Sequence, residues 1–405
     1  MPISVCDRLA ELGEIGRGER GLTRQLFTEP EHRASALLAR WGRELGCEVV
    51  QDHIGNLFIR RAGRTDAPAL QFGSHLDTVL DGGAYDGAYG VAGGLTVLAE
   101  LAAAGVQTQR TFELAAWAGE EGSRFPVGCL GSAVFAGWEH LDEMLELHGD
   151  DGMTLAQARS GPYGLLPDVP VRDDFPRPAA YAELHIEQGP VLERQSIPLG
   201  VVTAIAGMYR YTVHVHGEAG HAGTVPMAVR RDAFSAAAEF ALALETAARD
   251  VGDCVATIGW LAITPNQTNI VPGSVEFRID ARSTDAARLV EIDRRIHALA
   301  DEIAARRGVE VDVQRFEERA PTPLDERLKG TLRETLDREA FAHIDLPSGA
   351  VHDAMCIASL CPAAMLFVPS VAGASHVGHE HTQPADLERG VQAFKAWLLA
   401  IDRAL

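Results

Sequence analysis

Acidic and imidazole side chains gather in a glycine-rich loop early in the chain. Residues 70–90 run from a short apolar segment into this loop, which carries His75, Asp77 and Asp86. Imidazole and carboxylate groups that converge on one point can hold a divalent metal, and glycines let the backbone turn tightly around an ion. A lone His-x-Asp or Asp-Gly sequence is common in turns. The metal interpretation therefore depends on further clusters along the chain.

Three more clusters each begin or end an apolar stretch: Glu120-Glu121-Gly, His185-Ile-Glu187-Gln188-Gly and His376-x-x-x-Glu380-His381. Metal-assisted hydrolysis of an amide needs ligands that leave a position open for water, and a base that takes the proton of that water without binding the metal. Adjacent glutamates can supply one base and one ligand if they point in different directions. A solvated acidic turn is the commoner fate of such a pair, but four clusters in one chain favour a metal site. His185 and His376 add imidazoles, and Gln188 adds an amide that can hydrogen-bond a polar substrate.

Helices and strands alternate around these clusters. Apolar spacing predicts helices over residues 4–16, 29–46 and 91–104, and strands over 48–50, 52–61, 111–118 and 180–185. This alternation predicts an α/β domain with a mainly parallel sheet, whose ligands bind at the carboxyl ends of the strands. The early clusters lie at such ends.

The pattern changes after residue 207. Residues 211–216 alternate like a half-exposed strand, and the remainder predicts helices over 229–249 and 286–307 and strands over 255–264, 274–281 and 309–316. The order strand-helix-strand-strand-helix-strand is the ferredoxin-like split pattern. We therefore expect a first domain built from residues 1–207 and 321–405, with residues 208–320 inserted as a second domain.

Three polar residues of the inserted segment are candidates for substrate binding. His221, in Gly-His-Ala-Gly-Thr-Val-Pro, is able to donate a hydrogen bond to the oxyanion of a tetrahedral intermediate, if the domain closes or if a partner subunit presents it. Asn269 and Arg282 lie at strand margins. An arginine there can clamp a carboxylate or form a surface ion pair.

The composition restricts the partners and the compartment. Acidic residues outnumber basic ones by 57 to 36, and the formal charge of −21 disfavours nucleic acid and anionic membranes as partners. Six scattered cysteines are typical of reduced thiols in a cytosolic protein. No secretory signal is visible, and the longest apolar stretch, residues 91–106, is too short to span a bilayer. We expect a cytoplasmic protein that acts on a small molecule.

Taken together, the motifs resemble those of the M20-type metallohydrolases, in particular the hydantoinase/carbamoylase amidase family. This family contains N-carbamoyl-L-amino acid hydrolases, allantoate amidohydrolases and β-ureidopropionases. The matching motifs are Gly-Ser-His75-Leu-Asp77-Thr, Tyr-Asp86-Gly, Glu120-Glu121-Gly-Ser-Arg-Phe, Glu-Leu-His185-Ile-Glu-Gln188-Gly-Pro, His221-Ala-Gly-Thr-Val-Pro-Met, Asn269-Ile-Val-Pro-Gly, Asp-Ala-Arg282, Pro-Ser-Gly-Ala-Val-His352-Asp-Ala and Ser-His376-x-x-x-Glu380.

The resemblance implies two divalent ions per subunit, of zinc, manganese, cobalt or nickel. Asp86 would bridge the ions and His75 and His185 would complete different ions, while Glu121 and His376 supply the remaining ligands. Glu120 would be the general base, and Asp77 would orient His75. Substrate would be bound by Gln188, His221, Asn269, Arg282 and His352, with Arg282 on the substrate carboxylate. The family's smaller domain is a lid that also forms a homodimer interface, from which His221 would reach the partner's site.

Two departures from the family pattern affect the expected substrate. Val351 replaces a glycine beside His352, and the junction reads Gly207-Met208-Tyr209-Arg210, where allantoate enzymes tend to have Gly-Gln-Arg-Arg. We expect a metal-dependent amidohydrolase that cleaves the carbamoyl C–N bond of N-carbamoyl-L-amino acids. The alternatives are an allantoate amidohydrolase, a β-ureidopropionase and, from another class, a non-catalytic binding protein on the same scaffold. The intact Glu120-Glu121 pair disfavours the last alternative, because a binding protein needs no base.

Overall fold

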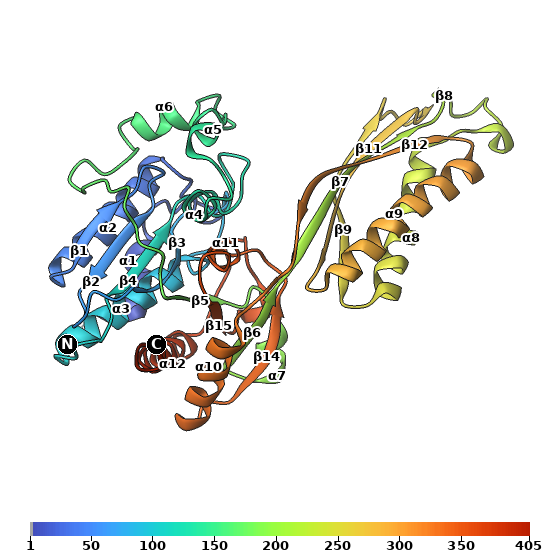
Figure 1. Cartoon of the computed structure of the whole chain (residues 1–405). Helices are drawn as coiled ribbons and strands as arrows, with labels where there is room; N and C mark the ends of the chain where they lie inside the picture. The colour runs from blue at the N-terminus through green and yellow to red at the C-terminus, as the bar shows by residue number, and fades with distance from the viewer. Residues whose placement is uncertain (1–2) are drawn as a thin grey trace. The chain divides into compact units, whose positions relative to one another are not determined.

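The computed structural model describes residues 3–405, which form two compact units (Figure 1). Unit 1 comprises the chain up to Thr203 together with Leu324–Leu346 and Ala350–Leu405. Unit 2 comprises Ala204–Pro323 and Pro347–Gly349. The chain therefore leaves the first unit, forms the second and returns.

A mixed sheet with a parallel centre organises the first unit. The strand order is β1-β2-β4-β3-β5-β15-β6-β13, and β14 pairs with β6. The central neighbours β4-β3, β3-β5 and β5-β15 are parallel, whereas the pairs towards both margins are antiparallel. The strands are β1 (Glu48–Gln51), β2 (Leu57–Arg61), β3 (Leu70–His75), β4 (Phe112–Trp117), β5 (Ala180–Ile186), β6 (Leu199–Ile205), β13 (Thr322–Pro323), β14 (His343–Ser348) and β15 (Ala363–Val368). The predicted α/β class is confirmed.

Helices cover this sheet and bury its central strands completely. Every residue of β3, β4, β5 and β15 is buried, as expected for strands that helices cover on both faces. Helix α3 is apolar around its whole circumference and contacts β3, β4 and β5, while α12 contacts β15 and α3. The helices of unit 1 are α1 (Val5–Gly13), α2 (Glu29–Glu44), α3 (Ala88–Ala103), α4 (Leu130–Ala136), α5 (Leu141–Leu145), α6 (Leu155–Ser160), α7 (Val191–Gln195), α10 (Glu326–Arg338), α11 (Asp353–Ile357), α12 (Pro384–Ala404) and the short 3₁₀ helix η2 (Val371–Gly373).

The second unit is a four-stranded antiparallel sheet with two long helices. The sheet order is β12-β7-β11-β9, formed by β7 (Gly207–His216), β9 (Cys254–Thr264), β11 (Ser274–Ser283) and β12 (Glu310–Arg319). Alternate residues of β11 are buried, and the Phe277 ring packs at a tilt against that of Phe240 in helix α8 (Ala233–Val251). Helix α9 (Ala286–Arg307) packs beside α8. A small ladder joins β8 (Gly220–His221) to β10 (Ile270–Val271), and the 3₁₀ helix η1 spans Met227–Val229.

Two predicted boundaries are wrong for local reasons. The strand expected over 52–61 begins only at Leu57, because the Asp52 carboxylate accepts the backbone N–H groups of Ile54, Gly55 and Asn56 and closes a turn. The helix expected from residue 229 begins at Ala233, where Asp232 caps it by accepting two backbone N–H groups.

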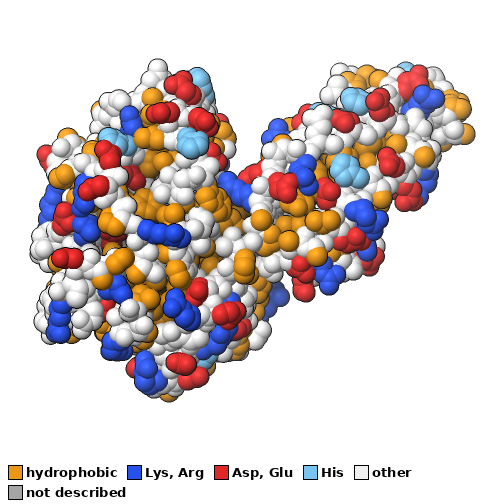
Figure 2. Space-filling view, in the orientation of Figure 1, with side chains coloured by type: hydrophobic (Ala, Val, Ile, Leu, Met, Phe, Trp, Pro, Cys, Tyr) orange, Lys and Arg blue, Asp and Glu red, His pale blue; other side chains and the backbone are white. Residues whose placement is uncertain are grey.

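The surface carries charged side chains of both signs. Acidic and basic side chains are interspersed over the face shown in Figure 2. Among residues 3–405, no helix is long and apolar enough to cross a membrane.

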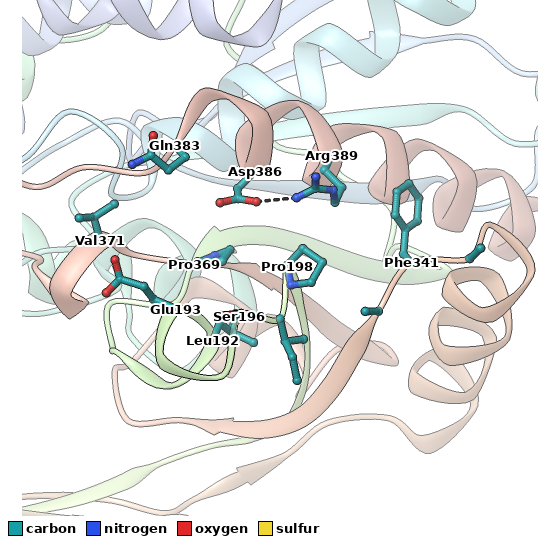
Figure 3. Close-up of a pocket in the computed structure, with 13 residues that line it drawn as sticks. Leu192, Glu193, Ser196, Pro198, Phe341, Pro369, Val371, Gln383, Asp386 and Arg389 are labelled. Carbon is teal, nitrogen blue, oxygen red and sulfur yellow. Dashed lines mark hydrogen bonds and ion pairs between the residues drawn. The ribbon is translucent and has the colours of Figure 1, made fainter.

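A cavity of about 500 Å³ opens in unit 1 (Figure 3). Its walls include Phe341, Pro198 and the ion pair between Arg389 and Asp386, whose Nη1 and Oδ1 atoms lie 2.6 Å apart. No predicted site residue lines this cavity, so it is distinct from the cluster described next.

Candidate active site and metal centre

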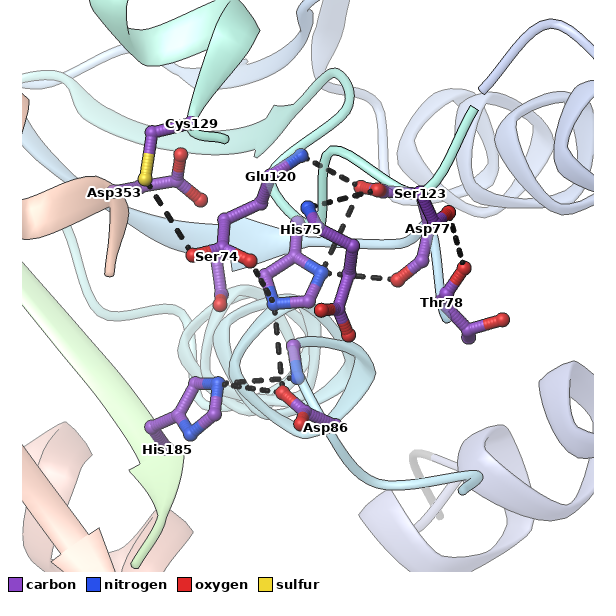
Figure 4. Close-up of polar contacts among 12 residues, drawn as sticks. Ser74, His75, Asp77, Thr78, Asp86, Glu120, Ser123, Cys129, His185 and Asp353 are labelled. Atoms are coloured by element: carbon purple, nitrogen blue, oxygen red, sulfur yellow. Dashed lines mark hydrogen bonds and ion pairs between the residues drawn. The ribbon is translucent and has the colours of Figure 1, made fainter. Parts of the chain in front are cut away.

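The predicted ligands meet at the carboxyl edge of the parallel strands. His75 ends β3, and His185 lies one residue before the end of β5. Glu120 and Glu121 follow β4, and His376 lies in the segment between β15 and α12. The carboxyl ends of parallel strands share one edge of a sheet, so residues at these ends converge although they are distant in sequence. Figure 4 shows His75, Glu120 and His185 beside Asp86.

Asp86 lies at the centre of the cluster. Its Oδ1 atom is 3.5 Å from His75 Nε2 and 3.2 Å from His185 Nε2, and its Oδ2 atom is 3.3 Å from His376 Nε2. The close approach of Asp86 to the His75 imidazole depends on the next residue, Gly87. Its φ is 61°, and an added Cβ there would lie 2.4 Å from the His75 ring. Only glycine fits this position.

Two groups of ligand atoms share the Asp86 carboxylate. His75, Asp86 and His185 form one group, and Asp86, Glu121 and His376 form the other, with the ligand atoms of each group within 4.8 Å of one another. Glu121 Oε2 is 3.3 Å from His376 Nε2, while its buried Oε1 has no hydrogen-bond partner. Buried carboxylates with an unsatisfied oxygen fit a divalent cation. Both His75 and His185 face the same Asp86 oxygen, which differs from the expectation that they complete different ions.

Backbone carbonyls set the orientation of both central imidazoles. His75 Nδ1 lies 3.0 Å from the Asp77 carbonyl oxygen, and His185 Nδ1 lies 2.9 Å from the Ile186 carbonyl oxygen. A carbonyl only accepts hydrogen bonds, so each Nδ1 carries a proton, and each ring can offer its Nε2 lone pair to a metal once Nε2 has lost its own proton.

Asp77 orients His75 through its backbone carbonyl, and its carboxylate also holds the turn that carries the two glutamates. This carboxylate lies 3.7 Å from His75 Nδ1, beyond hydrogen-bond range, and accepts the backbone N–H groups of Glu120 and Glu121, each at 3.1 Å. Both carboxylate oxygens are used, one for each N–H. Asp77 thereby fixes the turn from which the two glutamates diverge.

Charge and burial shift the pKa values of the cluster. Burial would raise the pKa of Asp86, but hydrogen bonds with His185, His376 and His75 hold it well below its usual range. Burial and repulsion by Asp86 raise the pKa of Glu121 to about 7, and the hydrogen bond with Asp86 raises the pKa of His376 to about 9. The ligands therefore hold extra protons when no cation is bound, and a metal would displace them.

Glu120 lies beside the ligands without contacting Asp86. Its Oε2 atom is 3.6 Å from His75 Nε2, and its Oε1 atom is 3.5 Å from the Cys129 sulfur. Burial raises the pKa of Glu120 well above its ordinary value, and repulsion by Glu121 acts in the same direction. A buried carboxyl of raised pKa beside a metal site is suited to accept and return a proton.

Gln188 and His352 also lie at this cluster. Gln188 Nε2 donates to Asp86 Oδ2 at 2.8 Å, and its buried Oε1 has no hydrogen-bond partner. The His352 ring lies 4.6 Å from that of His185, centroid to centroid. Burial and the neighbouring His185 lower the pKa of His352 well below its ordinary value, so this imidazole is neutral.

The remaining predicted residues lie in unit 2 and do not form one cluster there. His221 and Asn269 are neighbours, since the Ala222 N–H donates to the Asn269 carbonyl and β8 pairs with β10. Arg282 lies at the opposite end of β11 from Ser274 and binds both carboxylate oxygens of Asp280, at 2.7 and 3.0 Å.

Two buried acids beside this cluster were missed by the sequence reasoning. Glu183 accepts hydrogen bonds from Ser74 Oγ at 2.9 Å and from the Ala354 N–H at 3.0 Å. Asp353 accepts from Ser132 Oγ at 2.6 Å, and its Oδ2 has no hydrogen-bond partner. Glu183 was detectable, because it precedes His185 by two residues and therefore shares its face of the strand.

Known proteins share this fold over its whole length. The model of Peptidase family M20/M25/M40 matches residues 71–400. An N-carbamoyl-L-amino acid amidohydrolase of Geobacillus stearothermophilus is 39% identical over 399 residues, 97% of each chain. An allantoate amidohydrolase of Bacillus subtilis is 36% identical over 96% of this chain and 95% of the relative. The crystal structure of a hydantoinase/carbamoylase family amidase from Burkholderia multivorans has a TM-score of 0.90 at 36% identity, covering 98% of this chain and 96% of that one.

The fold and the site together define a class of protein, a hydrolase of mixed α/β fold with His, Asp and Glu clusters able to bind metal at the carboxyl edge of a mostly parallel sheet. The chain belongs to Peptidase family M20/M25/M40. The resemblance inferred from the motifs is confirmed.

Proposed function

We propose that this protein is a metal-dependent amidohydrolase that cleaves the carbamoyl C–N bond of N-carbamoyl-L-amino acids, releasing carbon dioxide, ammonia and the amino acid. The observation that carries the proposal is the Asp86 carboxylate, which faces two groups of ligands while Glu120 stays beside them. Relatives that carry the names of this activity and of allantoate hydrolysis support the same reaction type.

The proposed site holds two divalent ions of zinc, manganese, cobalt or nickel. His75, Asp86 and His185 would hold one ion, and Asp86, Glu121 and His376 the other. Mixed imidazole and carboxylate ligands suit several such metals. When bound, the metal acts as a Lewis acid that acidifies water and polarises the ureido carbonyl.

Glu120 performs the proton transfers in this mechanism. It accepts the proton of the attacking water and returns it to the nitrogen that leaves. Asp77 keeps the Glu120-Glu121 turn in place through both backbone N–H groups, so that the side chain of the base and that of the ligand point in different directions. Gln188 Oε1, buried without a partner, is available to accept a hydrogen bond from the ureido group.

The substrate's other contacts would come from residues in unit 2. His221 would stabilise the oxyanion, Asn269 would bind a polar group, and Arg282 would bind the carboxylate. Asp280 and the Gly349 carbonyl, which lies 3.0 Å from Arg282 Nη1, hold the guanidinium in one orientation.

We also propose that the second unit is a ferredoxin-like lid and dimerisation domain, inserted at about the predicted boundaries 208–320, and that the protein is a homodimer. Its β7-α8-β9-β11-α9-β12 order and β12-β7-β11-β9 sheet support the fold assignment. The margin strand β9 exposes Val255, Trp260 and Leu261, which supports an interface there.

A substrate panel tests the proposed reaction. Metal-free protein is loaded separately with manganese and zinc, and ammonia release is measured with N-carbamoyl-L-methionine, N-carbamoyl-β-alanine and allantoate. We expect metal-dependent turnover of N-carbamoyl-L-methionine. Turnover of only one of the other two compounds would reassign the substrate. Absence of turnover with metal bound, together with a melting shift on adding a panel compound, would favour a binding protein.

A further inference from the structure

Cys129 makes two contacts with Glu120, one from its backbone and one from its side chain. Its backbone N–H donates to the Glu120 carbonyl oxygen at 2.8 Å, and its thiol donates to Glu120 Oε1 at 3.5 Å (Figure 4). Both contacts close the loop between β4 and α4. Cys129 is the last residue of this loop and the N-cap residue of α4. One residue therefore contacts both the backbone and the carboxyl group of the residue that we propose as the base.

The backbone of Cys129 is in a conformation that favours glycine. Its φ is 57°, in the left-handed region, and Gln188 and His376 share this feature with φ values of 58°. Left-handed residues other than glycine cluster at functional sites, where the surrounding structure maintains the strain. Other non-glycine residues away from the site, such as Ala340, are also left-handed, so the conformation alone assigns no role and the contacts of the Cys129 thiol carry the argument.

The surroundings keep this thiol protonated. Cys129 is fully buried in a small apolar cluster with Ala133 and Cys356. A hydrogen bond with the Cys356 thiol raises the pKa of Cys129 well above its ordinary value, and burial adds to this shift. A protonated thiol is a weak hydrogen-bond donor with one S–H group, for which Glu120 Oε1, 3.5 Å from the sulfur, is a better acceptor than the Cys356 sulfur.

We propose that Cys129 is a positioning residue for Glu120. The S–H group anchors Oε1, and the anchored carboxyl presents Oε2 towards His75 Nε2, at 3.6 Å. One oxygen is thereby reserved for orientation and the other for proton transfer. The inference rests on the proposed function of Glu120 as the base, and it adds a thiol contact that sets the direction of that base.

Three substitutions at position 129 distinguish the effect of the thiol from the effect of the strained backbone turn. Cys129→Gly relieves the backbone strain and removes the donor, Cys129→Ala removes only the donor, and Cys129→Ser restores a donor. We expect the Cys129→Gly and Cys129→Ala variants to lower kcat roughly tenfold with KM and metal content unchanged, because a misdirected catalytic group slows the chemical step. The Cys129→Ser variant should recover part of the rate. Cys361→Ala is the matched control, since Cys361 is also buried but its thiol contacts the Ile357 carbonyl.

An infrared measurement on the metal-free protein gives a readout that does not depend on turnover. The S–H stretching band of Cys129, identified by its loss in Cys129→Ser, should shift when Glu120→Gln changes the acceptor from a carboxyl group to an amide. An unshifted band, or full kcat in both Cys129→Ala and Cys129→Gly, would overturn the inference. Full activity of Glu120→Gln would instead remove the proposed base, so the two failures can be told apart.

Discussion

The side chains of Glu120 and Glu121 have different surroundings, because Asp77 holds these two adjacent residues through their backbone alone. Asp77 accepts the N–H groups of Glu120 and Glu121 and leaves both side chains free to diverge. Glu121 turns to His376 and Glu120 turns to Cys129 and His75. The proposed ligand and the proposed base are therefore adjacent in sequence but face different partners.

Paired substitutions distinguish these two side chains. Glu120→Gln should lower kcat by at least about 100-fold and leave the metal content unchanged, because the proposed proton acceptor is not among the proposed metal ligands. Glu121→Gln should lower the number of metal ions retained after dialysis, because an amide is a weaker ligand than a carboxylate. Both variants are measured for kcat and for metal per chain. Metal loss in Glu120→Gln with full retention in Glu121→Gln would exchange the roles.

Glu121 also makes the stability of the metal-free protein depend on pH. Its pKa is about 7 in the folded state and 4.5 as an ordinary glutamate, so the folded state binds more protons between these values. The free energy of unfolding should therefore fall as the pH rises from about 4.5 to 7, by on the order of 3 kcal/mol from this residue.

Urea unfolding of chelator-treated protein measures this dependence. Glu121→Gln cannot ionise and should show a smaller decrease over the same pH range. Asp52, whose pKa burial raises to about 7, contributes equally to both proteins and cancels in the comparison. Identical pH dependence in the two proteins would contradict the assignment.

At the level of elements, the start of α3 determines how closely the chain approaches His75. Gly87→Ala should lower the affinity for metal, because the new Cβ would lie 2.4 Å from the imidazole and displace the ring. Gly105, just past the end of α3, is the matched control: its φ of 62° equals that of Gly87 within a degree, but nothing lies within 4 Å of its added Cβ. Gly105→Ala should cost only the left-handed strain of about 1–2 kcal/mol and leave metal binding intact. Equal metal affinity in both variants would contradict the steric argument.

The elements that carry the ligands were predictable because their patterns are local. The buried strands β3, β4 and β5 are short apolar runs that end at polar clusters, and parallel strands place such ends on one edge. The convergence of His75, Glu121 and His185 follows from that rule alone.

Contacts between loops were not predictable in the same way. Asp77 was expected to orient His75, and the second contact of this residue, from its carboxylate to the turn after β4, is one that no local pattern reveals. Cys129 reaches Glu120 only because residues 121–128 form a loop that returns to β4. Such contacts depend on tertiary structure, and no pattern in the sequence distinguishes Cys129 from the other five free cysteines.

At the level of the whole molecule, the predicted site residues are divided between two units. All predicted metal ligands belong to unit 1, whereas His221, Asn269 and Arg282 belong to unit 2. Each unit has its own hydrophobic core, so each positions its own residues. The proposed site would therefore need unit 2 from the same chain or from a partner chain, and the two proposed arrangements predict opposite results in hybrid dimers.

The hybrid of Glu120→Gln and His221→Ala subunits tests the partner arrangement. If His221 serves the partner's site, the His221→Ala subunit keeps its own Glu120 and receives an intact His221 from the Glu120→Gln subunit. One of the two sites is then unchanged, and the hybrid should have about half the wild-type activity, although each parent dimer is nearly inactive. The hybrid is obtained by co-expression with two different affinity tags and sequential purification.

A second hybrid reverses the expectation and serves as the control. It joins a wild-type subunit to a subunit that carries both substitutions. If His221 acts in its own chain, the wild-type subunit keeps a complete site, so the second hybrid should have about half the activity and the first almost none. If His221 serves the partner, the site of the wild-type subunit lacks this imidazole, because the double variant cannot supply it, and the second hybrid should be inactive while the first is active. Equal activity of the two hybrids would contradict any essential role of His221, because both arrangements require them to differ.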